Sequence, residues 1–440
     1  MVVLKFGGTS VGSASRMKEV TKILLDTKGE KVVVLSAVSG TTNALVEITQ
    51  LFKDGETKRV QNCISELRAK YDLLIEELYE NAVDRTEAQT HVQRHFKELQ
   101  KLTSQPYYDQ IPKIIVVMGE LISTKLFSLY LTSIAVKNEL LSALDFMYLN
   151  EMGDPDIETI RTRLSQILAK KEDCDLFITQ GFLCRNVHGG TDNLKRGGSD
   201  YSATLIGAAL KSDEVQIWTD IDGMHNNDPR VVNQTRPISK LSFEEASELA
   251  YFGAKILHPH CIIPAHFHNV PVRIKNTMKP DAHGTLISSE TNPTGVKAIA
   301  AKSDITAVKI KSSRMIMAYG FLRKVFEVFE KFQTPIDMIT TSEVAISLTI
   351  DDQTYLEDIH QEILPFGKVE IDRDQTIICI VGDMVAENRG LGSEILKALH
   401  DIPIRMISYG GSKNNISLLI DTQYKSEALN LLNDELFDFK

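Results

Sequence analysis

Apolar and polar positions alternate along the first part of the chain in a way that predicts strands separated by helices. Val2–Phe6 is an apolar run that stops at Gly7-Gly8, and Lys31–Leu35 is a second apolar run. Between them, Met17–Leu25 carries apolar residues at helical spacing. A strand, a helix and a strand this close together predict a right-handed βαβ unit in a parallel sheet.

The segment from residue 43 to 105 has a different pattern, polar and helix-favouring. Val60–Leu78 repeats apolar residues at helical intervals, so a helical excursion is expected there. Apolar runs then predict further strands, with a helical pattern at Ser202–Leu210; the runs are Ile114–Met118, Phe177–Thr179 and Val215–Trp218. The alternation predicts one α/β domain with a central, mostly parallel sheet.

The composition changes at His283–Lys297, where Ser, Thr, Pro and Gly predict a linker. Beyond it, smaller elements predict one βαββαβ unit between residues 306 and 371 and a second, from 375 to 435, that lacks its last strand. Val296–Ala300 could supply that strand, which would interleave the two modules. The expected boundaries are 1–285 for the first domain, 286–296 for a linker and 297–440 for the tail, with 303–373 inserted between 297–302 and 374–440.

Composition and charge narrow the classes of partner. The formal net charge of −10 argues against a nucleic acid or an anionic membrane surface as partner. The five cysteines are scattered without a CxxC pair, as in a reducing compartment. No apolar run approaches the roughly 20 residues that span a bilayer, and the chain starts directly with a strand. A cytoplasmic location is therefore expected.

The first candidate site is the run Lys5-Phe6-Gly7-Gly8-Thr9-Ser10, between a strand and a helix. Two glycines let the backbone approach an oxyanion closely, and a helix N-terminus adds positive potential. The lysine adds a compact positive charge, so the run resembles a phosphate cradle. It is not a Walker A loop, because GxxxxGK[ST] does not occur. Taken alone, an ordinary strand-to-helix turn explains it equally well.

A second glycine pair, in Arg196-Gly197-Gly198-Ser199-Asp200, again precedes a helical run. A guanidinium and a carboxylate flank this turn, and a guanidinium can hold an anion. Two such loops at the carboxyl ends of strands in one sheet could face each other across a ligand crevice. The pair is stronger evidence than either loop alone.

Two further motifs follow. Thr219 and Asp220, after an apolar run, could hold a ribose or base, and Arg230 could hold a phosphate, although a surface turn explains the run nearly as well. Lys255, among small and apolar residues, is a candidate for a second phosphate-binding ammonium. The histidines between residues 258 and 268 lack a zinc spacing, so no direct metal ligand is expected; His91 and His95 are expected on a solvated helix face.

Taken together, the motifs closely resemble the aspartate kinase family of the amino-acid kinase fold. KFGGTSVG at the start, MGELIS at 118–123, RGGSD at 196–200, TDIDG with DPR, and FGAKILHP occur in the family's order. The tail resembles the family's tandem ACT modules, so the resemblance covers essentially the whole chain. It implies ATP-dependent phosphorylation of the β-carboxylate of L-aspartate to 4-phospho-L-aspartate, the first step of lysine, threonine and methionine biosynthesis.

The resemblance also implies roles for single residues. Lys5, Gly7, Gly8, Asp200 and Lys255 would be catalytic, with Mg²⁺ bound only through the ATP phosphates. The aspartate-binding residues would be Thr42, Glu120, Arg196 and Ser199, with Glu120 meeting the ammonium and Arg196 the α-carboxylate. The ATP-binding residues would be Lys5, Gly8, Thr219, Asp220, His225, Arg230 and Lys255. Before RGGSD, Lys195 replaces the family's usual glycine, and His225 stands where tyrosine is frequent.

The tail resembles lysine-sensitive members of the family, which implies free lysine as an inhibitor. The implied effector-binding residues are Met315, Ala318, Gly320, Phe321, Asp337, Ser342 and Glu343. ACT modules that pair edge to edge imply a homodimer or a dimer of dimers. Another amino-acid kinase, such as one for glutamate, and a catalytically silent amino-acid sensor remain the alternatives.

Overall fold

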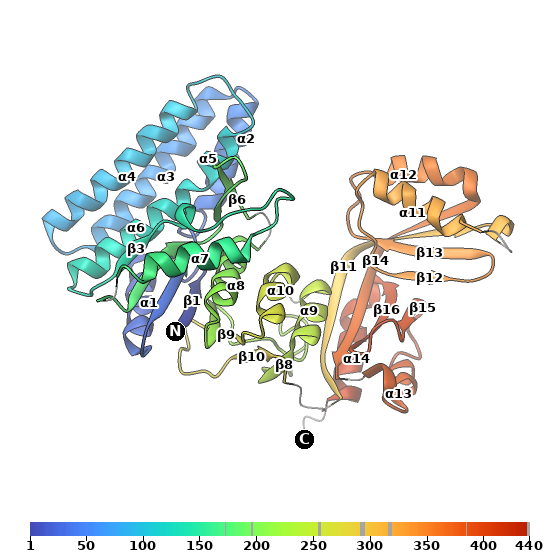
Figure 1. Ribbon diagram of the computed structural model, residues 1–440. Helices are drawn as coiled ribbons and strands as arrows, with labels where there is room; N and C mark the ends of the chain where they lie inside the picture. Colours follow the sequence, from blue (N-terminus) through green and yellow to red (C-terminus); the bar gives the residue numbers. More distant parts are fainter. Residues whose placement is uncertain are drawn as a thin grey trace. The chain divides into compact units, whose positions relative to one another are not determined.

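The computed structural model describes residues 1–171, 173–194, 197–253, 257–290, 295–315, 319–383 and 385–437 (Figure 1). These residues pack into two compact units. The first unit comprises Met1–Met224, Ser239–Phe243 and Leu257–Glu290, and the second comprises His225–Ile238, Glu244–Ile256 and Thr291–Lys440. Each unit has its own sheet and its own hydrophobic core.

The first unit is built on a sheet with the strand order β3-β4-β2-β1-β7-β9-β10-β8. All neighbouring strands run parallel except β9 and β10. The bounds are β1 Val2–Phe6, β2 Lys31–Leu35, β3 Glu139–Leu141, β4 Leu176–Gln180, β7 Glu214–Thr219, β8 Lys240–Ser242, β9 Val272–Asn276 and β10 Thr285–Ser288. The predicted parallel α/β sheet is confirmed, and β10 forms within the stretch expected to be an irregular linker.

Helices surround this sheet, and the long helices α3 and α4 lie side by side (Figure 1). The helices of the first unit are α1 Ala14–Asp26, α2 Thr41–Lys53, α3 Thr57–Leu78, α4 Ala82–Leu102, α5 Ile111–Val116, α6 Met118–Ser133, α7 Ile157–Leu168, α8 Gly198–Leu210 and α10 Pro259–Phe267. A short hairpin, β5 Leu183–Arg185 and β6 Thr191–Asn193, precedes α8. The predicted helical excursion corresponds to α2, α3 and α4.

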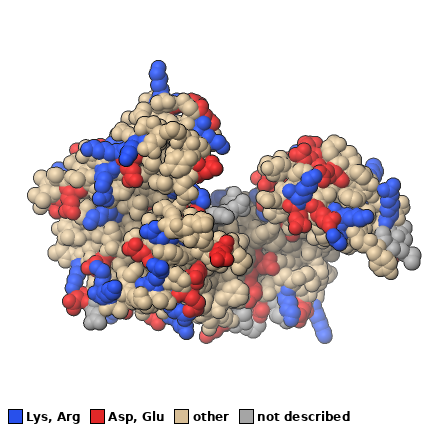
Figure 2. Space-filling model, turned by 45° about the horizontal axis from the view of Figure 1, so that its top comes forward, with Lys and Arg blue, Asp and Glu red and all other residues tan. Residues whose placement is uncertain are grey.

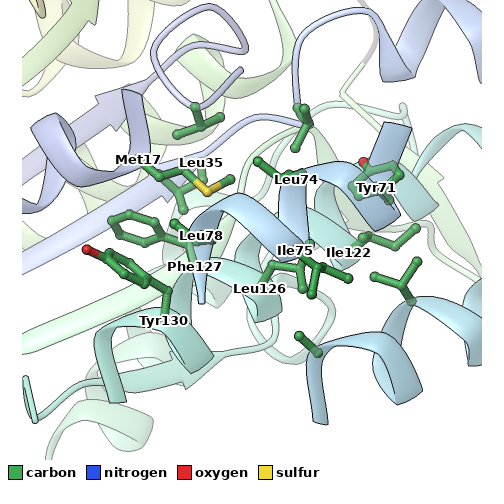
Figure 3. Close-up of a cluster of buried hydrophobic side chains, with 14 of the residues drawn as sticks. Met17, Leu35, Tyr71, Leu74, Ile75, Leu78, Ile122, Leu126, Phe127 and Tyr130 are labelled. Atoms are coloured by element: carbon green, nitrogen blue, oxygen red, sulfur yellow. The ribbon is translucent and has the colours of Figure 1, made fainter. Parts of the chain in front are cut away.

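The apolar stripe of α3 explains why this helix belongs to the core. Its buried residues recur at three- and four-residue spacings, as on one face of a helix; they are Val60, Ile64, Leu67, Tyr71, Leu74, Ile75 and Leu78. Figure 3 shows several of them beside Met17 of α1, Leu35 of β2 and Leu126 of α6. The helical excursion and the sheet therefore share one core.

The prediction of a strand at Ile114–Met118 is wrong, because these residues end α5 and begin α6. A short run of β-branched residues does not distinguish a buried strand from a buried helix. The segment Ile111–Ser133 is also long and apolar enough to cross a membrane by length and composition, contrary to the expectation that no apolar run approaches that length. Of the most apolar stretch within this segment, 72% is buried inside the unit, as in the core helix of a folded domain.

His91 and His95 of α4 do not form the solvated face expected for them. His95 is buried, and the two ring centroids lie 4.5 Å apart. Burial lowers the pKa of both imidazoles, that of His91 to about 3. Both rings are therefore neutral at physiological pH and act as packing groups in the helical layer.

The second unit is a six-stranded antiparallel sheet with the order β12-β13-β11-β14-β16-β15. Its strands are β11 Val296–Lys311, β12 Ile339–Thr341, β13 Ala345–Ile350, β14 Lys368–Gly382, β15 Ile404–Tyr409 and β16 Asn415–Asp421. The long central strands β11 and β14 each run through both modules. The predicted interleaving of two βαββαβ modules is confirmed, because β11 continues from Val296 into the first module.

Each module has a core of its own. Helices α11 Phe321–Lys331 and α12 Leu356–Ile363 cover one half of the sheet, and α13 Leu391–Ala398 and α14 Lys425–Leu436 cover the other. Helix α9 Phe243–Tyr251 and the segment 225–238 also contribute to this unit. Asn227 Nδ2 donates to the Leu429 carbonyl of α14 at 3.1 Å, which fixes that segment to the C-terminal helix.

Candidate active site

A cavity of about 560 Å³ lies in the first unit where the parallel strands end. Loops after β1, β2 and β7 and the first turns of α2, α6 and α8 contribute its walls. The lining residues are Lys5, Gly7, Gly8, Thr9, Ser36, Ala37, Val38, Ser39, Gly40, Thr42, Asn43, Glu120, Phe182, Gly198, Ser199, Thr219 and Asp220. Open α/β sheets bind ligands at this edge, and the two glycine-pair motifs meet there as predicted.

Lys5 and Asp200 form an ion pair at this cavity. Lys5 Nζ lies 2.6 Å from Asp200 Oδ1, and the side chains are 11% and 17% exposed. Lys5 stands near the end of β1, and Asp200 in the first turn of α8. The carboxylate therefore holds the ammonium at the cavity wall, with enough exposure to reach an anionic ligand.

The glycines of the first motif leave room beside this ammonium. A Cβ added to Gly7 would lie 3.3 Å from Lys5 Nζ, and one added to Gly8 would lie 3.0 Å from the Ala37 carbonyl oxygen. Side chains there would fill the space next to the charge and crowd the loop after β2. The pocket thus fits a phosphate group, which needs both the open backbone and the cation.

The helices whose N-termini reach the cavity are not the helix that was expected after Gly7-Gly8. Helix α1 begins only at Ala14, capped by Ser13, so it does not directly follow the glycine pair. Instead, the first turns of α2 and α8 line the cavity through Thr42 and Ser199. Helix N-termini carry positive partial charge. Figure 2 shows acidic and basic side chains interspersed on the face drawn, without a broad basic surface there.

Glu120 is a buried carboxyl group in the first turn of α6. The residue is 3% exposed, and its Oε1 accepts a hydrogen bond from the Ala37 N–H at 3.3 Å. Oε2 has no hydrogen-bond partner among the described residues. Burial raises the pKa of this carboxyl group to about 8, against the opposing effect of the backbone hydrogen bonds. A cationic ligand group would satisfy the free oxygen and favour the ionised form.

A chain of hydroxyl groups connects three lining elements, and sequence reasoning missed two of its members. Ser36 Oγ donates to Ser199 Oγ at 2.9 Å, and Ser123 Oγ donates to the Ser36 carbonyl at 2.8 Å. Neither Ser36 nor Ser123 was singled out from the sequence. The available signal was position, since Ser36 begins the small-residue loop after β2, which is adjacent and parallel to β1.

Comparison with known proteins agrees with this geometry. Residues 1–276 match the amino acid kinase family, and residues 378–436 match the ACT domain. Lysine-sensitive aspartokinase 3 of Escherichia coli is 32% identical over 457 residues, which cover 100% of this chain and 99% of that protein. The chain belongs to the aspartokinase family. The family resemblance of the motifs is confirmed, and with it the assignment to the aspartate kinase enzymes.

Other aspartokinases are similar over the same length. The chloroplastic aspartokinase 3 of Arabidopsis thaliana is 34% identical over 466 residues, covering 99% of this chain and 81% of that protein. The crystal structure of E. coli aspartokinase III with aspartate and ADP matches with a TM-score of 0.85 and 32% identity, each chain being covered completely. The lysine and aspartate complex of the same enzyme matches with a TM-score of 0.83, again at 32% identity and full coverage of both chains.

Not every residue implied by the aspartokinase resemblance lines this cavity. Thr219 and Asp220 do, and Thr219 Oγ1 donates to Asp220 Oδ1 at 3.1 Å. His225 and Arg230 pack with the second unit, where the Arg230 guanidinium donates to both carboxylate oxygens of Asp228. Their roles in nucleotide binding remain predictions. Arg196 and Lys255 lie outside the described residues.

The proposed effector residues lie in the second unit, apart from Ala318, which is outside the described residues. Met315 and Phe321 pack on the core of the first module, and Gly320 begins α11 in a left-handed conformation. Ser342 and Glu343 are exposed. These placements leave the effector assignment a prediction.

Asp337 is engaged within the second unit. Lys302 Nζ donates to its Oδ1 at 2.7 Å, and the Tyr251 hydroxyl donates to the same oxygen at 2.8 Å. The Asp337 side chain is 1% exposed, and it lines a cavity of about 290 Å³. An effector ammonium at Asp337 would have to share the carboxylate with Lys302.

Proposed function

We propose that this aspartokinase transfers the γ-phosphoryl group of ATP to the β-carboxylate of L-aspartate, giving 4-phospho-L-aspartate and ADP. The observation that carries the proposal is one cavity that joins the Lys5–Asp200 ion pair, the glycine pair and the buried Glu120 carboxyl group. These groups offer a cation for phosphoryl oxygens and an anion for an amino acid's ammonium.

The chemistry needs no general base. A β-carboxylate has a reference pKa of about 3.9 and is ionised at neutral pH. Catalysis then consists of aligning this nucleophile with the phosphorus atom and neutralising charge on the phosphoryl oxygens. In this proposal the Lys5 ammonium and the Gly7-Gly8 backbone take that role, and the Asp200 carboxylate, 2.6 Å from the ammonium, orients it. The bond from phosphorus to the β-γ bridging oxygen breaks as the bond to the carboxylate oxygen forms.

Mg²⁺ fits this site as a partner of the nucleotide. The described lining includes the carboxyl groups of Glu120 and Asp220, and Asp200 behind it is already paired with Lys5. A magnesium ion held chiefly by ATP phosphates would supply additional positive charge for the transferring group.

The regulatory proposal is feedback inhibition by free lysine through the ACT modules, in a cytoplasmic homodimer or dimer of dimers. Two observations support it: the lysine-sensitive E. coli relative is similar over the full chain, and Asp337 offers a carboxylate at a cavity of the second unit. Inhibition requires that lysine bind more tightly to a less active state.

An ATP-dependent hydroxylamine assay tests both proposals. Aspartyl hydroxamate should form from aspartate and not from glutamate, and saturating lysine should reduce the rate. Hydroxamate from glutamate alone would indicate a different amino-acid kinase, and no hydroxamate from either amino acid would indicate a silent sensor. Activity that lysine leaves unchanged would contradict only the regulatory proposal.

A further inference from the structure

An ion pair and a hydrogen bond connect β6, the strand before the second glycine-pair motif, to α5, the helix before Glu120. Lys113 of α5 donates from its Nζ to Asp192 Oδ2 of β6 at 2.6 Å. Next to it, Gln110 Nε2 donates to the Thr191 carbonyl at 2.6 Å. The Asp192 side chain is 14% exposed and that of Lys113 is 41% exposed, so the carboxylate is held below the surface by a partly covered ammonium.

Further contacts fix the hairpin on both sides of this ion pair. Asp192 Oδ1 accepts the N–H of Asn193 at 2.8 Å, so both carboxylate oxygens are engaged. The Leu194 N–H donates to the Phe182 carbonyl at 2.8 Å, and the Phe182 N–H donates to Ser202 Oγ of α8 at 2.9 Å. The hairpin is therefore joined to α5 at one side and to α8 at the other.

The far side of the glycine loop is packed just as closely. A Cβ added to Gly198 would lie 2.5 Å from Phe182 Cδ2, and one added to Gly197 would lie 2.3 Å from Cys261 Sγ. Gly197 also has a φ of +73°, which side-chain-bearing residues rarely adopt. The described residues before and after positions 195 and 196 thus have little freedom to move.

We propose that Lys113 and Asp192 are a positioning pair for aspartate. The inference rests on the proposed function, in which the Glu120 carboxyl group meets the substrate ammonium, and on the implied aspartate contact of Ser199 in the second glycine-pair motif. Lys113 is carried by the helix that leads into α6 and Glu120, and Asp192 by the strand that leads into the loop. One ion pair thereby sets the spacing between the elements that carry Glu120 and Ser199.

The energy scale separates this role from a purely structural one. A partly exposed ion pair contributes little to folding stability, so its loss should hardly change the melting temperature. Misplacing a binding group by about 1 Å can cost up to 100-fold in rate. A positioning pair should consequently affect aspartate binding much more than folding.

The test uses Asp192→Asn, Lys113→Met and the exchanged pair Lys113→Asp with Asp192→Lys. Each single variant should raise KM for aspartate about 5- to 10-fold, change KM for ATP less than about 2-fold and keep the melting temperature within about 2 °C. The exchanged pair should recover at least part of the loss. Lys171→Met is the matched control, because Lys171 pairs with Glu139 at the opposite end of the strands.

Amide hydrogen exchange makes the test independent of turnover. Exchange at 191–194 should be faster in Asp192→Asn than in the unsubstituted chain, and unchanged in Lys171→Met. Unaltered exchange, or an unaltered KM for aspartate in an active enzyme, would overturn the positioning role. A parallel loss of aspartate binding, ATP binding and thermal stability would also overturn it. An unsubstituted chain that forms no aspartyl hydroxamate would instead contradict the proposed function, while the exchange result would still judge the anchoring.

Discussion

The ammonium of Lys5 lies 2.6 Å from Asp200 Oδ1, although 195 positions separate the two residues in the sequence (200 − 5 = 195). The parallel arrangement of β1 and its neighbours makes this contact, since it brings the loop after β1 and the start of α8 to one edge of the sheet. The pair gives the cavity an oriented cation.

Replacing Lys5 with Ala should lower kcat about 100- to 1000-fold and leave KM for aspartate within a few-fold. The reason is that charge on the phosphoryl oxygens grows most during transfer, when a positioned cation stabilises it. Steady-state kinetics with both substrates varied would measure this. Lys22→Ala, at an exposed pair on α1, is the control. An unchanged kcat in the Lys5 variant would remove this residue from the catalytic machinery.

Aspartate binding should weaken as pH falls from 8.5 to 6. Burial raises the pKa of Glu120 to about 8, so at lower pH the free enzyme carries a neutral carboxylic acid where the substrate ammonium needs an anion. KM for aspartate should therefore rise on acidification, while KM for ATP changes less. In Glu120→Gln, KM should be high and nearly independent of pH over this range. An equally steep profile in that variant would assign the titration to another group.

The same carboxyl group should make folding stability pH-dependent. Between its reference pKa of 4.5 and about 8, the folded chain holds a proton that the unfolded chain releases. The unfolding free energy contributed by this group therefore falls as pH rises through this window, by up to about 1.4 kcal/mol per pH unit. Glu120→Gln should flatten that slope in thermal unfolding followed at several pH values. The unfolding curves of the unsubstituted chain and of Glu120→Gln should coincide most closely near pH 4.5.

Two substitutions in the second unit should change the inhibition by free lysine in opposite directions. Asp337→Asn should raise the lysine concentration for half-inhibition at least about 10-fold, because it removes a buried charge partner of the ammonium. Lys302→Met should lower this concentration, because the effector would no longer share the carboxylate with the Lys302 ammonium. Lys331→Met, at the Lys331–Glu362 surface pair of the same module, is the control. Equal half-inhibition in all four proteins would place the effector elsewhere.

A buried ion pair in the second unit should contribute strongly to the free energy of unfolding. Lys297 Nζ lies 2.8 Å from Glu245 Oε2, and the side chains are 6% and 0% exposed. Lys297→Met should cost about 3–5 kcal/mol, because it removes the buried ammonium that pairs with the Glu245 carboxylate. The double variant with Glu245→Leu should recover much of that loss. Denaturant unfolding would compare these proteins with Lys311→Met, whose exposed pair with Glu370 should contribute about 0–1 kcal/mol.

The sequence alone was sufficient for the elements with clear periodicity. Lys31–Leu35 and the apolar stripe of α3 were predicted correctly, because a buried strand and an amphipathic helix each repeat apolar residues with a distinct period. The interleaved tail followed from counting elements, since Val296–Ala300 was the remaining strand. The glycine pairs likewise indicated an anion site, because their backbone chemistry is local.

Only the tertiary structure decided which side chains meet. Ile114–Met118 is helical because tertiary packing determines its conformation. A short apolar run does not encode that packing. The Ser36–Ser199 hydrogen bond, the Lys113–Asp192 ion pair and the occupied carboxylate of Asp337 each join residues far apart in the chain. Local sequence determines period, turns and charge, whereas such contacts depend on the strand order and on the direction in which each loop leaves the sheet.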